Sequence, residues 1–392
     1  MKKEFWAEYD LYKKLTEDEW QNKGILDGLV GKNPNPKGLP DGWVTINKFS
    51  RLQILAVTLA SNRKAKWKDY RGKVRQSNVK DYARTGALQY NEKSGLLFWY
   101  TEGNYHDFLQ GSLKEMLTVL GLNNPHETVS PSLPNLSIFP KGSWAIQVNF
   151  TLKKPYISKD DVDFYIIDNP VKKEWVFKVP YVSPSQWKGA LRAAMTMELA
   201  NWWLGLEKAD RKKHKNQKEF VKRRLQLARL FGNEKGVLVD DKRFEAYLDT
   251  VAGSKHLNRW YRRSLRFLCS RTGFIQGSLH FYPTFFDRIG LEVINPHDRK
   301  TGAGKQPIYF ECVPAGTPGI FTLLYVPPAN IDEDTAKADL KAVAKGVQVM
   351  LTQYGFGAKT SSGYGVAEID KFVTRKHSEH GEIETQSFDF GG

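Results

Sequence analysis

Cysteine is nearly absent from this chain: Cys269 and Cys312 are the only two among 392 residues. Two separated thiols supply neither a disulfide framework nor the clustered spacing of a structural zinc site, and they suit a reducing compartment. Long apolar runs are also missing, so no segment is expected to span a membrane. The first ten residues, MKKEFWAEYD, lack the apolar centre of a signal peptide. These absences predict a cytoplasmic protein without a membrane partner.

Acidic residues are outnumbered by basic ones. The sequence has 59 Lys and Arg against 43 Asp and Glu, which gives a net charge of +16, and its pI is near 9.5. A protein can be this basic merely by being soluble, but clustered cations are typical of nucleic-acid binding. We therefore expect a polyanionic partner, in a chain long enough for two or three domains.

The N-terminal third has weak patterns. Residues 64–84 interleave basic and aromatic side chains, which suits single-stranded nucleic acid because rings stack on bases while cations hold phosphates. A solvated loop with a few packed rings is an equally good interpretation. Residues 106–122 are expected to be helical, and 123–142, with four prolines, are expected to form a linker.

From residue 143 onward, strand and helix signals are clear. Residues 144–152 alternate in hydrophobicity and are rich in β formers, which predicts a strand. Ser183, Pro184 and Gln186 predict a helix start, with a serine N-cap, proline at the first helical position and a capping-box glutamine. Further elements are expected as a helix at 332–354 and as strands at 274–281, 309–313, 319–326 and 366–373. The order β-α-β-β-α-β is typical of an α+β, ferredoxin-like (RRM-type) unit.

Two basic segments interrupt this unit. Residues 204–230 are expected to form a basic insertion, within which 212–219 has no apolar face and is expected to be a mobile loop. Residues 255–271 place arginines at i, i+3, i+4 and i+7, which makes a cationic stripe if the segment is helical: Arg259, Arg262, Arg263 and Arg266. A solvated helix face would look the same, but six basic residues without an acid favour RNA phosphates.

Two motifs lie at opposite ends of the same unit. The first is 167–173, IDNPVKK, continued by 180–192, PYVSPSQWKGALR; the second is the glycine-rich stretch 355–365, GFGAKTSSGYG. Together they resemble the RAMP superfamily of CRISPR systems, and within it the backbone subunits of type III (Csm/Cmr-like) effector complexes. Two positions depart from the family pattern, with Pro184 in place of glycine and Gln186 in place of serine.

The resemblance implies that Asp168 cuts target RNA, with a divalent cation, Mg²⁺ or Mn²⁺, as cofactor. A loop carboxylate can bind such a cation, or position a 2′-hydroxyl for attack on the adjacent phosphate, which restricts cleavage to RNA. The metal ligands are left open, and three nearby acids are candidates: Asp160, Asp161 and Asp163. From local sequence alone, an Asx-turn before Pro170 is the plainer interpretation of Asp168.

The resemblance and the basic pattern together define the residues expected to bind RNA. Glycines allow close approach of the backbone to a phosphate, while basic and hydroxyl side chains donate hydrogen bonds to it. His297 is also a candidate general acid or base, although a histidine in a basic loop is more often a plain surface residue. The expected RNA-binding residues are Lys172, Lys173, Ser185, Lys188, Arg192, Arg259, Arg262, Arg266, His297, Arg299, Gly355, Gly357, Lys359, Ser361 and Gly363.

The resemblance covers residues 145–373. It implies a RAMP domain at 143–373. The chain before it is expected to form an N-terminal α/β extension with a Pro-rich linker at 1–142, and residues 374–392, which include few apolar side chains, are expected to form a disordered tail. The implied partners are guide RNA, target RNA, other RAMP subunits and a polymerase-like large subunit, from which this chain differs by lacking a GGDD motif. We expect an RNA-binding endoribonuclease subunit that holds guide RNA and cleaves the paired target RNA. The alternatives are a non-catalytic end-capping subunit and a guide-RNA-processing endoribonuclease.

Overall fold

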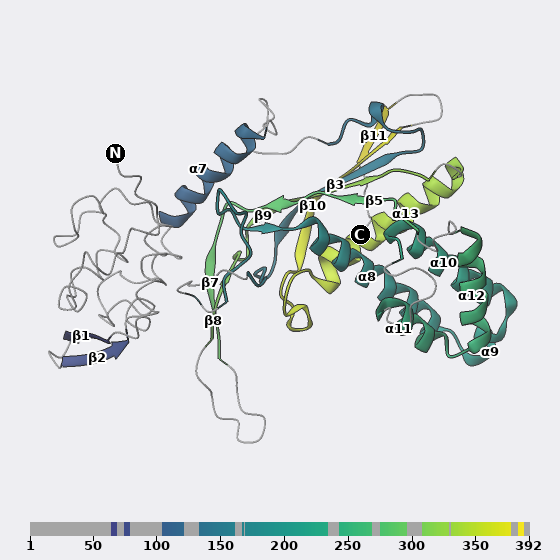
Figure 1. The fold of residues 1–392 in the computed structure, drawn as a ribbon, viewed down its shortest axis with the longest axis horizontal. Helices are drawn as coiled ribbons and strands as arrows, with labels where there is room; N and C mark the ends of the chain where they lie inside the picture. Colours follow the sequence, from purple (N-terminus) through teal and green to yellow (C-terminus); the bar gives the residue numbers. More distant parts are fainter. Residues whose placement is uncertain are drawn as a thin grey trace, which may run out of the picture. The chain divides into compact units, whose positions relative to one another are not determined.

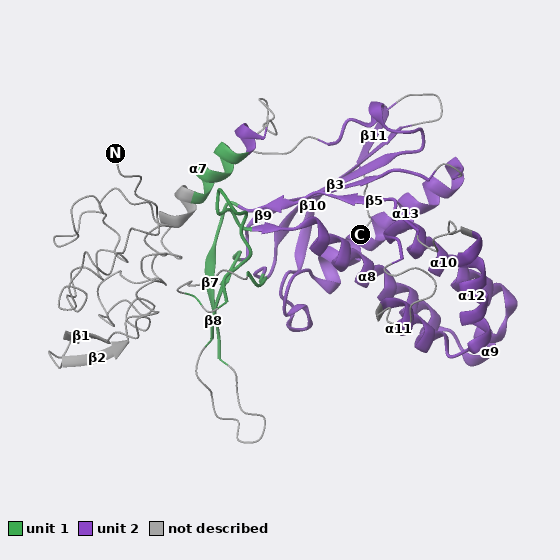
Figure 2. Cartoon of the chain, viewed as in Figure 1, with its two compact units in different colours: residues 1–116, 157–180, 287–314 green, residues 117–156, 181–286, 315–392 purple. Residues whose placement is uncertain are grey.

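The chain divides into two compact units, each built from several segments. The computed structural model describes residues 64–68, 74–78, 104–120, 133–160, 167, 169–233, 243–268, 275–295, 308–328, 331–377 and 383–387. Unit 1 comprises residues 1–116, 157–180 and 287–314, and unit 2 comprises 117–156, 181–286 and 315–392 (Figure 2). Each unit is assembled from segments far apart in the sequence, and the expected domain boundary after residue 142 stays a prediction.

Unit 2 is built on an antiparallel sheet with the strand order β11-β10-β3-β9-β5. In the chain, β3 is followed by helix α8, then β5, β9, helix α13 and β10 (Figure 1). The spatial order is therefore fourth, first, third and second strand of a β-α-β-β-α-β unit, with β11 added at one edge. This confirms the expected ferredoxin-like fold. The bounds are β3 Trp144–Leu152, α8 Pro184–Gly205, β5 Leu279–Phe281, β9 Pro318–Tyr325, α13 Glu333–Val349, β10 Ala367–His377 and β11 Ile383–Ser387.

The central strand β3 shows why the sheet buries one face under the helices. From Ile146 onward, buried residues alternate with partly exposed ones. The buried residues on the helix side are Trp144, Ile146, Val148, Phe150 and Leu152, while Ala145 is buried in a separate cluster with Leu136 and Leu324. Phe150 meets the ring of Trp187 on α8 edge-on, with centroids 6.2 Å apart. The indole nitrogen of Trp187 donates to the hydroxyl of Thr284 at 3.0 Å, so this buried polar atom is satisfied.

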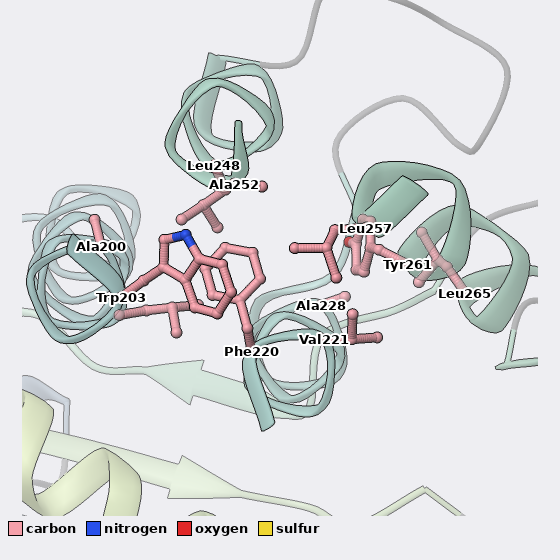
Figure 3. Packing of buried hydrophobic residues seen from close by; sticks show 11 residues of the cluster. Ala200, Trp203, Phe220, Val221, Ala228, Leu248, Ala252, Leu257, Tyr261 and Leu265 are labelled. Atoms are coloured by element: carbon pink, nitrogen blue, oxygen red, sulfur yellow. The ribbon is translucent and has the colours of Figure 1, made fainter. Parts of the chain in front are cut away.

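A helical insertion lies between α8 and β5 and has a hydrophobic core of its own. It consists of α9 (Lys208–Lys212), α10 (His214–Phe231), α11 (Arg243–Ala252) and α12 (Lys255–Leu268). Trp203 at the end of α8 packs on Phe220 of α10 with ring centroids 4.5 Å apart, and Leu257 and Tyr261 of α12 close the same cluster (Figure 3).

The expectation of a mobile loop at 212–219 is wrong. Lys213 is extended, with φ −64° and ψ 127°, and it separates α9 from α10, which begins at His214. The first turn of α10 has no buried residue, and its apolar contacts begin at Phe220 and Val221. The residue range 212–219, on which the expectation of a loop was based, therefore ends just before the side chains that hold α10 in place.

Asp339 on α13 ties the insertion to the sheet. Its carboxylate has no exposed surface and accepts two hydrogen bonds from the Arg229 guanidinium of α10, at 3.0 and 2.6 Å. It also accepts from the Gln226 amide at 2.8 Å and from the Tyr325 hydroxyl of β9 at 3.1 Å. Burial, and then the Asp339 charge, raise the pKa of Tyr325, so the phenol stays neutral and remains a donor.

The C-terminal tail is also more ordered than expected. Disorder was expected from Thr374, but β10 continues to His377 and pairs with β11 in antiparallel register, from Val373 opposite Ser387 to His377 opposite Ile383. All five residues of β11 are exposed. The strand is held by backbone pairing rather than by an apolar face, so hydrophobic periodicity could not reveal it.

The remaining described elements are short or lie in unit 1. In unit 1, β1 and β2 form an antiparallel pair, and β7 and β8 form another. Strand β8 matches the strand expected at 309–313, whereas β7 was not predicted. The helix expected at 106–122 is α7, whereas the strand expected at 274–281 is reduced to β5. Bounds are β1 Lys64–Lys68, β2 Val74–Asn78, α7 Asn104–Val119, η3 Leu136–Ile138, β4 Tyr181–Val182, β6 Thr284–Phe285, β7 Gly290–Ile294 and β8 Ile308–Cys312. Among the described segments, no helix is both long and apolar enough to cross a membrane.

We predict that Asp339→Ala lowers the free energy of unfolding by about 3–5 kcal/mol, because it leaves the Arg229 guanidinium without its buried partner. Asp334→Ala is the matched control, since Asp334 is an exposed carboxylate on the same helix and its loss should cost less than about 1 kcal/mol. Urea denaturation followed by far-UV circular dichroism measures both. An equal loss of unfolding free energy in the two variants would contradict the role of Asp339 in attaching the insertion to the sheet.

Candidate nucleic-acid interface

Within unit 1, the segment after Asp168 is fastened to strand β8. The side-chain amide of Asn169 donates to the carbonyl of Tyr309 at 3.2 Å, and the backbone N–H of Glu311 donates to the carbonyl of Asn169 at 2.9 Å. The backbone N–H of Val171 donates to the Glu311 carboxylate at 3.3 Å. The segment therefore runs alongside β8 and is held by both side-chain and backbone hydrogen bonds.

A buried ion pair completes this attachment. The ammonium of Lys173 contacts the carboxylate of Glu311, and their side chains are 5% and 0% exposed. The same ammonium donates to the carbonyl of Val171 at 3.3 Å. Lys173 was expected to bind RNA phosphates, but its charge lies inside unit 1 and is neutralised by Glu311. The structure thus assigns it to holding the loop.

The opposite side of the segment is fastened as well. The backbone N–H of Lys172 donates to the Ser158 hydroxyl at 2.8 Å, and that of Lys173 donates to the Asp160 carboxylate at 3.3 Å. The N–H of Asp160 in turn donates to the carbonyl of Pro170 at 3.0 Å. Residues 169–173 are therefore held from two directions.

Asp168 itself lies outside the described residues, as do Asp161, Asp163, His297 and Arg299. Its neighbours are described on both sides: Ile167 is 1% exposed, and Asn169 bridges to Phe310 of β8. The described residues on both sides of position 168 are therefore held in place.

A tight turn follows the segment and exposes an aromatic ring that the sequence did not single out. The Glu174 carboxylate accepts from the backbone N–H groups of Val176 and Phe177, at 2.8 and 2.6 Å. Trp175 is 80% exposed at this turn, and the Lys178 ammonium lies 4.7 Å from its ring centroid. The exposure of Trp175 follows from the turn that the Glu174 carboxylate stabilises.

In unit 2, the start of α8 has the predicted cap. The Ser183 hydroxyl accepts from the backbone N–H of Gln186, and Pro184 occupies the first turn. The Gln186 side chain accepts from the Tyr156 hydroxyl at 2.8 Å instead of completing a capping box. Ser185 is exposed on the first turn. The departure of Gln186 from the family serine therefore supplies a contact to the sheet side of the unit.

The two basic residues predicted on α8 are partly buried. Lys188 and Arg192 are both intermediate in exposure. The Arg192 guanidinium lies over the Phe244 ring of α11, 4.9 Å from its centroid. The guanidinium of Arg192 thus packs against the helical insertion, which leaves less of it accessible to an RNA phosphate than the sequence suggested.

The glycine-rich stretch lies beside the start of α8, so the two motif regions of unit 2 meet. The Phe356 ring is 4.4 Å from that of Trp187 and 5.4 Å from that of Tyr156. The backbone N–H of Gly365 donates to the carbonyl of Pro155 at 2.9 Å, which brings the end of the stretch onto the chain leaving β3. The aromatic contact between Trp187 and Phe356 therefore joins two segments that lie more than 160 residues apart in the chain.

The glycines of this stretch have two different roles. Gly355 and Gly365 form its neck: each has a φ of +72°, and a Cβ would lie 2.6 Å from the Tyr364 oxygen or 1.9 Å from the Phe356 oxygen. Gly363, at φ +84°, has nothing within 4 Å of its Cβ position. Gly355 and Gly365 allow the two ends of the stretch to pack closely together, whereas the backbone at Gly363 has open space above it.

The outer part of the loop carries the other predicted residues. A 3-10 helix, η5 (Thr360–Ser362), begins after Lys359, which has a left-handed backbone with φ 58°. Lys359 and Ser361 are exposed, and Gly357 also has a positive φ of 95°. This arrangement presents a cation, a hydroxyl and accessible backbone on one small loop.

The predicted cationic stripe lies on α12, and its members differ in their contacts. Arg259, Arg263 and Arg266 are exposed, while the guanidinium of Arg262 pairs with Asp249 of α11 at 2.5 Å. Asp249 also binds Arg224, which is 2% exposed. Arg262 is therefore partly neutralised, in contrast to the other three.

The described residues hold no group of three or more His, Cys, Asp and Glu side chains that is arranged to bind a metal ion. Of the acids considered as cation ligands, the structure describes Asp160, which is engaged in holding the loop. The thiol of Cys312 lies next to Glu311 and is no nucleophile, because burial raises its pKa to about 12.

A family model for the RAMP superfamily matches residues 150–368, more than half of the chain. This chain belongs to the RAMP superfamily. The match spans both motifs and runs from the last three residues of β3 to the first two residues of β10. It therefore includes α8, the helical insertion, β5, β9 and α13 but only short pieces of β3 and β10, and residues 1–149 precede it.

Three solved structures resemble this RAMP protein at low identity. A chain from a cryo-EM structure of the type III-B Cmr-beta bound to cognate target RNA is 15% identical, with 72% of this chain and 66% of that chain covered, just under two thirds, and a TM-score of 0.34. Cmr6 from Pyrococcus furiosus is 16% identical, with 58% and 98% covered and a TM-score of 0.30. A CRISPR RNA-guided surveillance complex contains a chain that is 15% identical, with 59% and 68% covered and a TM-score of 0.33. No curated protein matches.

We predict that Lys173→Ala destabilises unit 1 locally by about 3–5 kcal/mol, because it leaves the Glu311 carboxylate buried and unpaired. Lys172→Ala is the control: its side chain is only half-buried, and the loss should stay below about 1 kcal/mol. Hydrogen exchange at the amides of β7 and β8 measures the difference. The double variant Lys173→Met, Glu311→Leu should recover most of the loss, and equal effects of the two single lysine variants would contradict the anchoring role.

We predict that Gly365→Ala destabilises the protein far more than Gly363→Ala, because the first Cβ meets the Phe356 carbonyl whereas the second meets open space. Gly363→Ala should cost about 1–2 kcal/mol, from its left-handed backbone alone. Thermal unfolding ranks the two.

Gly363→Val is then the variant for an RNA test: it should weaken guide RNA binding with the fold retained, and unchanged binding would make the loop only a turn.

Proposed function

We propose that this RAMP protein is a subunit of a type III CRISPR effector complex that holds guide RNA and cuts the paired target RNA at Asp168. The observation that carries the proposal is the attachment of residues 169–173 to β8 and to 158–160. A catalytic carboxylate must be held close to its target atom, and a segment with fixed ends meets that demand. A plain Asx-turn would require only the local contact before Pro170.

The proposed reaction uses the ribose of the target as nucleophile. The Asp168 carboxylate accepts the proton of a 2′-hydroxyl, and the 2′-oxygen forms a bond to the adjacent phosphorus. The bond from phosphorus to the 5′-oxygen of the next nucleotide breaks, and that oxygen takes up a proton from solvent. The products are a 2′,3′-cyclic phosphate and a 5′-hydroxyl end, and DNA is not a substrate because it lacks the nucleophile.

A divalent cation, Mg²⁺ or Mn²⁺, is part of this proposal, and when bound it would neutralise charge that develops on the phosphate. Asp160 is a weak candidate to hold it alone, since one of its oxygens accepts the Lys173 N–H. Asp168 with Asp161 or Asp163 is the donor set that the sequence offers there.

Several described side chains support RNA binding around these motifs. Ser185, Lys359 and Ser361 are exposed on the α8 start and the glycine-rich loop, which lie together in unit 2. In unit 1, the exposed Trp175 offers a ring for base stacking next to the Lys178 cation. These residues replace Lys173 in the proposed RNA-binding set.

The proposed partners are guide RNA (crRNA), target RNA, other RAMP subunits and a polymerase-like large subunit, in the cytoplasm. An end-capping subunit without cleavage is the second candidate, and the region that precedes the RAMP match favours it, because a repeated filament subunit has little use for one. A guide-processing endoribonuclease would act alone, and gel filtration of the RNA-bound protein would separate it from both assembly members.

We predict that Asp168→Ala assembles and binds target RNA normally but loses the cut at this subunit by about 10²–10⁴-fold, since the proton acceptor is gone. Cuts made by neighbouring subunits should remain. Asp168→Asn is the matched variant, because asparagine supports an Asx-turn equally well but does not take up the proton. The assay is an end-labelled target RNA with a divalent cation, and a single 2′-deoxy sugar at the cut site should abolish the same product.

The two Asp168 variants separate the possible outcomes. Loss of cleavage in both, with assembly intact, agrees with the proposal. An unchanged product ladder in both would contradict it and favour the end-capping function. Loss of assembly in Asp168→Ala together with normal behaviour of Asp168→Asn would make the residue a turn former.

A further inference from the structure

We propose that the exposed face of α12 is a separate binding surface for single-stranded RNA, with Phe267 as a stacking platform between arginines. The inference rests on the proposed function only in taking RNA as the partner, and it does not involve Asp168. The RAMP motifs do not include this helix, which belongs to the insertion between α8 and β5.

The orientation of α12 is set by its buried side. Leu257, Tyr261 and Leu265 are each 2% exposed or less and pack into the core of the insertion (Figure 3). The Arg224 guanidinium lies 3.9 Å from the Tyr261 ring centroid and fixes that ring further. Because these residues repeat at i, i+4 and i+8, the opposite side of the helix must face solvent.

The solvent side carries five cations, one of which, Arg262, is paired with an acid. Lys255, Arg259, Arg262, Arg263 and Arg266 are all exposed, and the helix contains no acidic residue. Within the described segments, Asp249 is the acid that reaches this face, and it is shared between Arg262 and the buried Arg224. No ion pair in that part of the chain joins Arg259, Arg263 or Arg266 to a carboxylate.

The arginines of this face repel one another, and a bound anion would relieve that repulsion. Arg259 and Arg263, and Arg262 and Arg266, are like charges at i, i+4, a spacing at which they repel one another. All four are arginines, whose planar fork binds phosphate oxygens in pairs, whereas lysine serves equally well for a merely solvated surface. The chemistry that matches the face is therefore a row of phosphates.

An aromatic ring beside the arginines favours single-stranded RNA over a duplex. Phe267 is 81% exposed, one residue after Arg266 and one helical turn after Arg263. Trp260, in contrast, is partly buried against the core of the insertion, with the His214 and His256 rings 5.6 and 6.4 Å away. Unstacked bases stack on exposed rings while cations hold their phosphates, and a duplex has no free base face to offer. An acidic protein surface would match the charge but gives no role to the ring.

The test compares two triple variants with equal charge loss in the complete, guide-loaded assembly. Arg259→Ala, Arg263→Ala, Arg266→Ala removes three cations from α12. Lys337→Ala, Lys341→Ala, Lys345→Ala removes three exposed cations from α13 of the same unit. Affinity for a labelled single-stranded target RNA longer than the guide is measured over a range of salt concentrations.

The α12 triple variant should reduce the log–log salt slope by about 2, since each phosphate contact on a single strand contributes about 0.7. The α13 triple variant should leave the slope unchanged. Phe267→Ala should weaken binding roughly tenfold, and Phe267→Trp should restore it, because stacking needs a ring. All the substituted side chains are exposed, so the fold is retained, as circular dichroism would verify.

Three results would overturn the inference. Equal slope changes in the two triple variants would reduce the face to general attraction by a basic protein. An unchanged affinity in Phe267→Ala would remove the stacking platform. Normal RNA affinity with loss of a subunit from the assembly would make the face a protein interface. The α12 variants are judged by RNA affinity and the Asp168 variants by cleavage, so a failure of either proposal would be seen separately.

Discussion

A carboxylate without any exposed surface must be paired with a cation, and this constraint organises both units. In unit 1, Glu311 is neutralised by Lys173, and in unit 2, Asp339 is neutralised by Arg229. Each pair joins segments that are more than a hundred residues apart in the chain. Because an unpaired buried charge is so costly, neither pair can open without loosening the element that it holds.

Each of these two ion pairs fixes a different segment of the protein. The Asp339 pair fixes a helical insertion to a ferredoxin-like sheet, so that α12 can expose a row of arginines at a constant orientation. The Glu311 pair fixes the chain segment that follows Asp168. In both places a buried ion pair gives a rigid base to a surface that we propose to contact RNA, and positioning of an RNA backbone would require such a base.

Local signals were sufficient for much of the fold. The strand at 144–152, the Ser183 cap and the helix from 332 were predictable because each depends on residues a few positions apart. The strand β11 and the first turn of α10 were not, since neither has an apolar face of its own. Lys172 and Lys173 look alike in sequence, and only burial against a glutamate 138 residues away separates them. The two kinds of glycine in the 355–365 loop differ in the same way, through contacts that no local pattern contains.

The central claim is that the segment fixed by Lys173 and Glu311 places Asp168 at the sugar of a target nucleotide. A cryo-EM map of the assembled complex, with guide RNA and a target that stays intact because the ribose at the cut site lacks its 2′-hydroxyl, tests this directly. The account predicts a carboxylate oxygen of Asp168 at about 3–4 Å from that C2′ atom, within reach of a hydroxyl proton there. A segment that faces protein, with no target nucleotide in reach of Asp168, would contradict it.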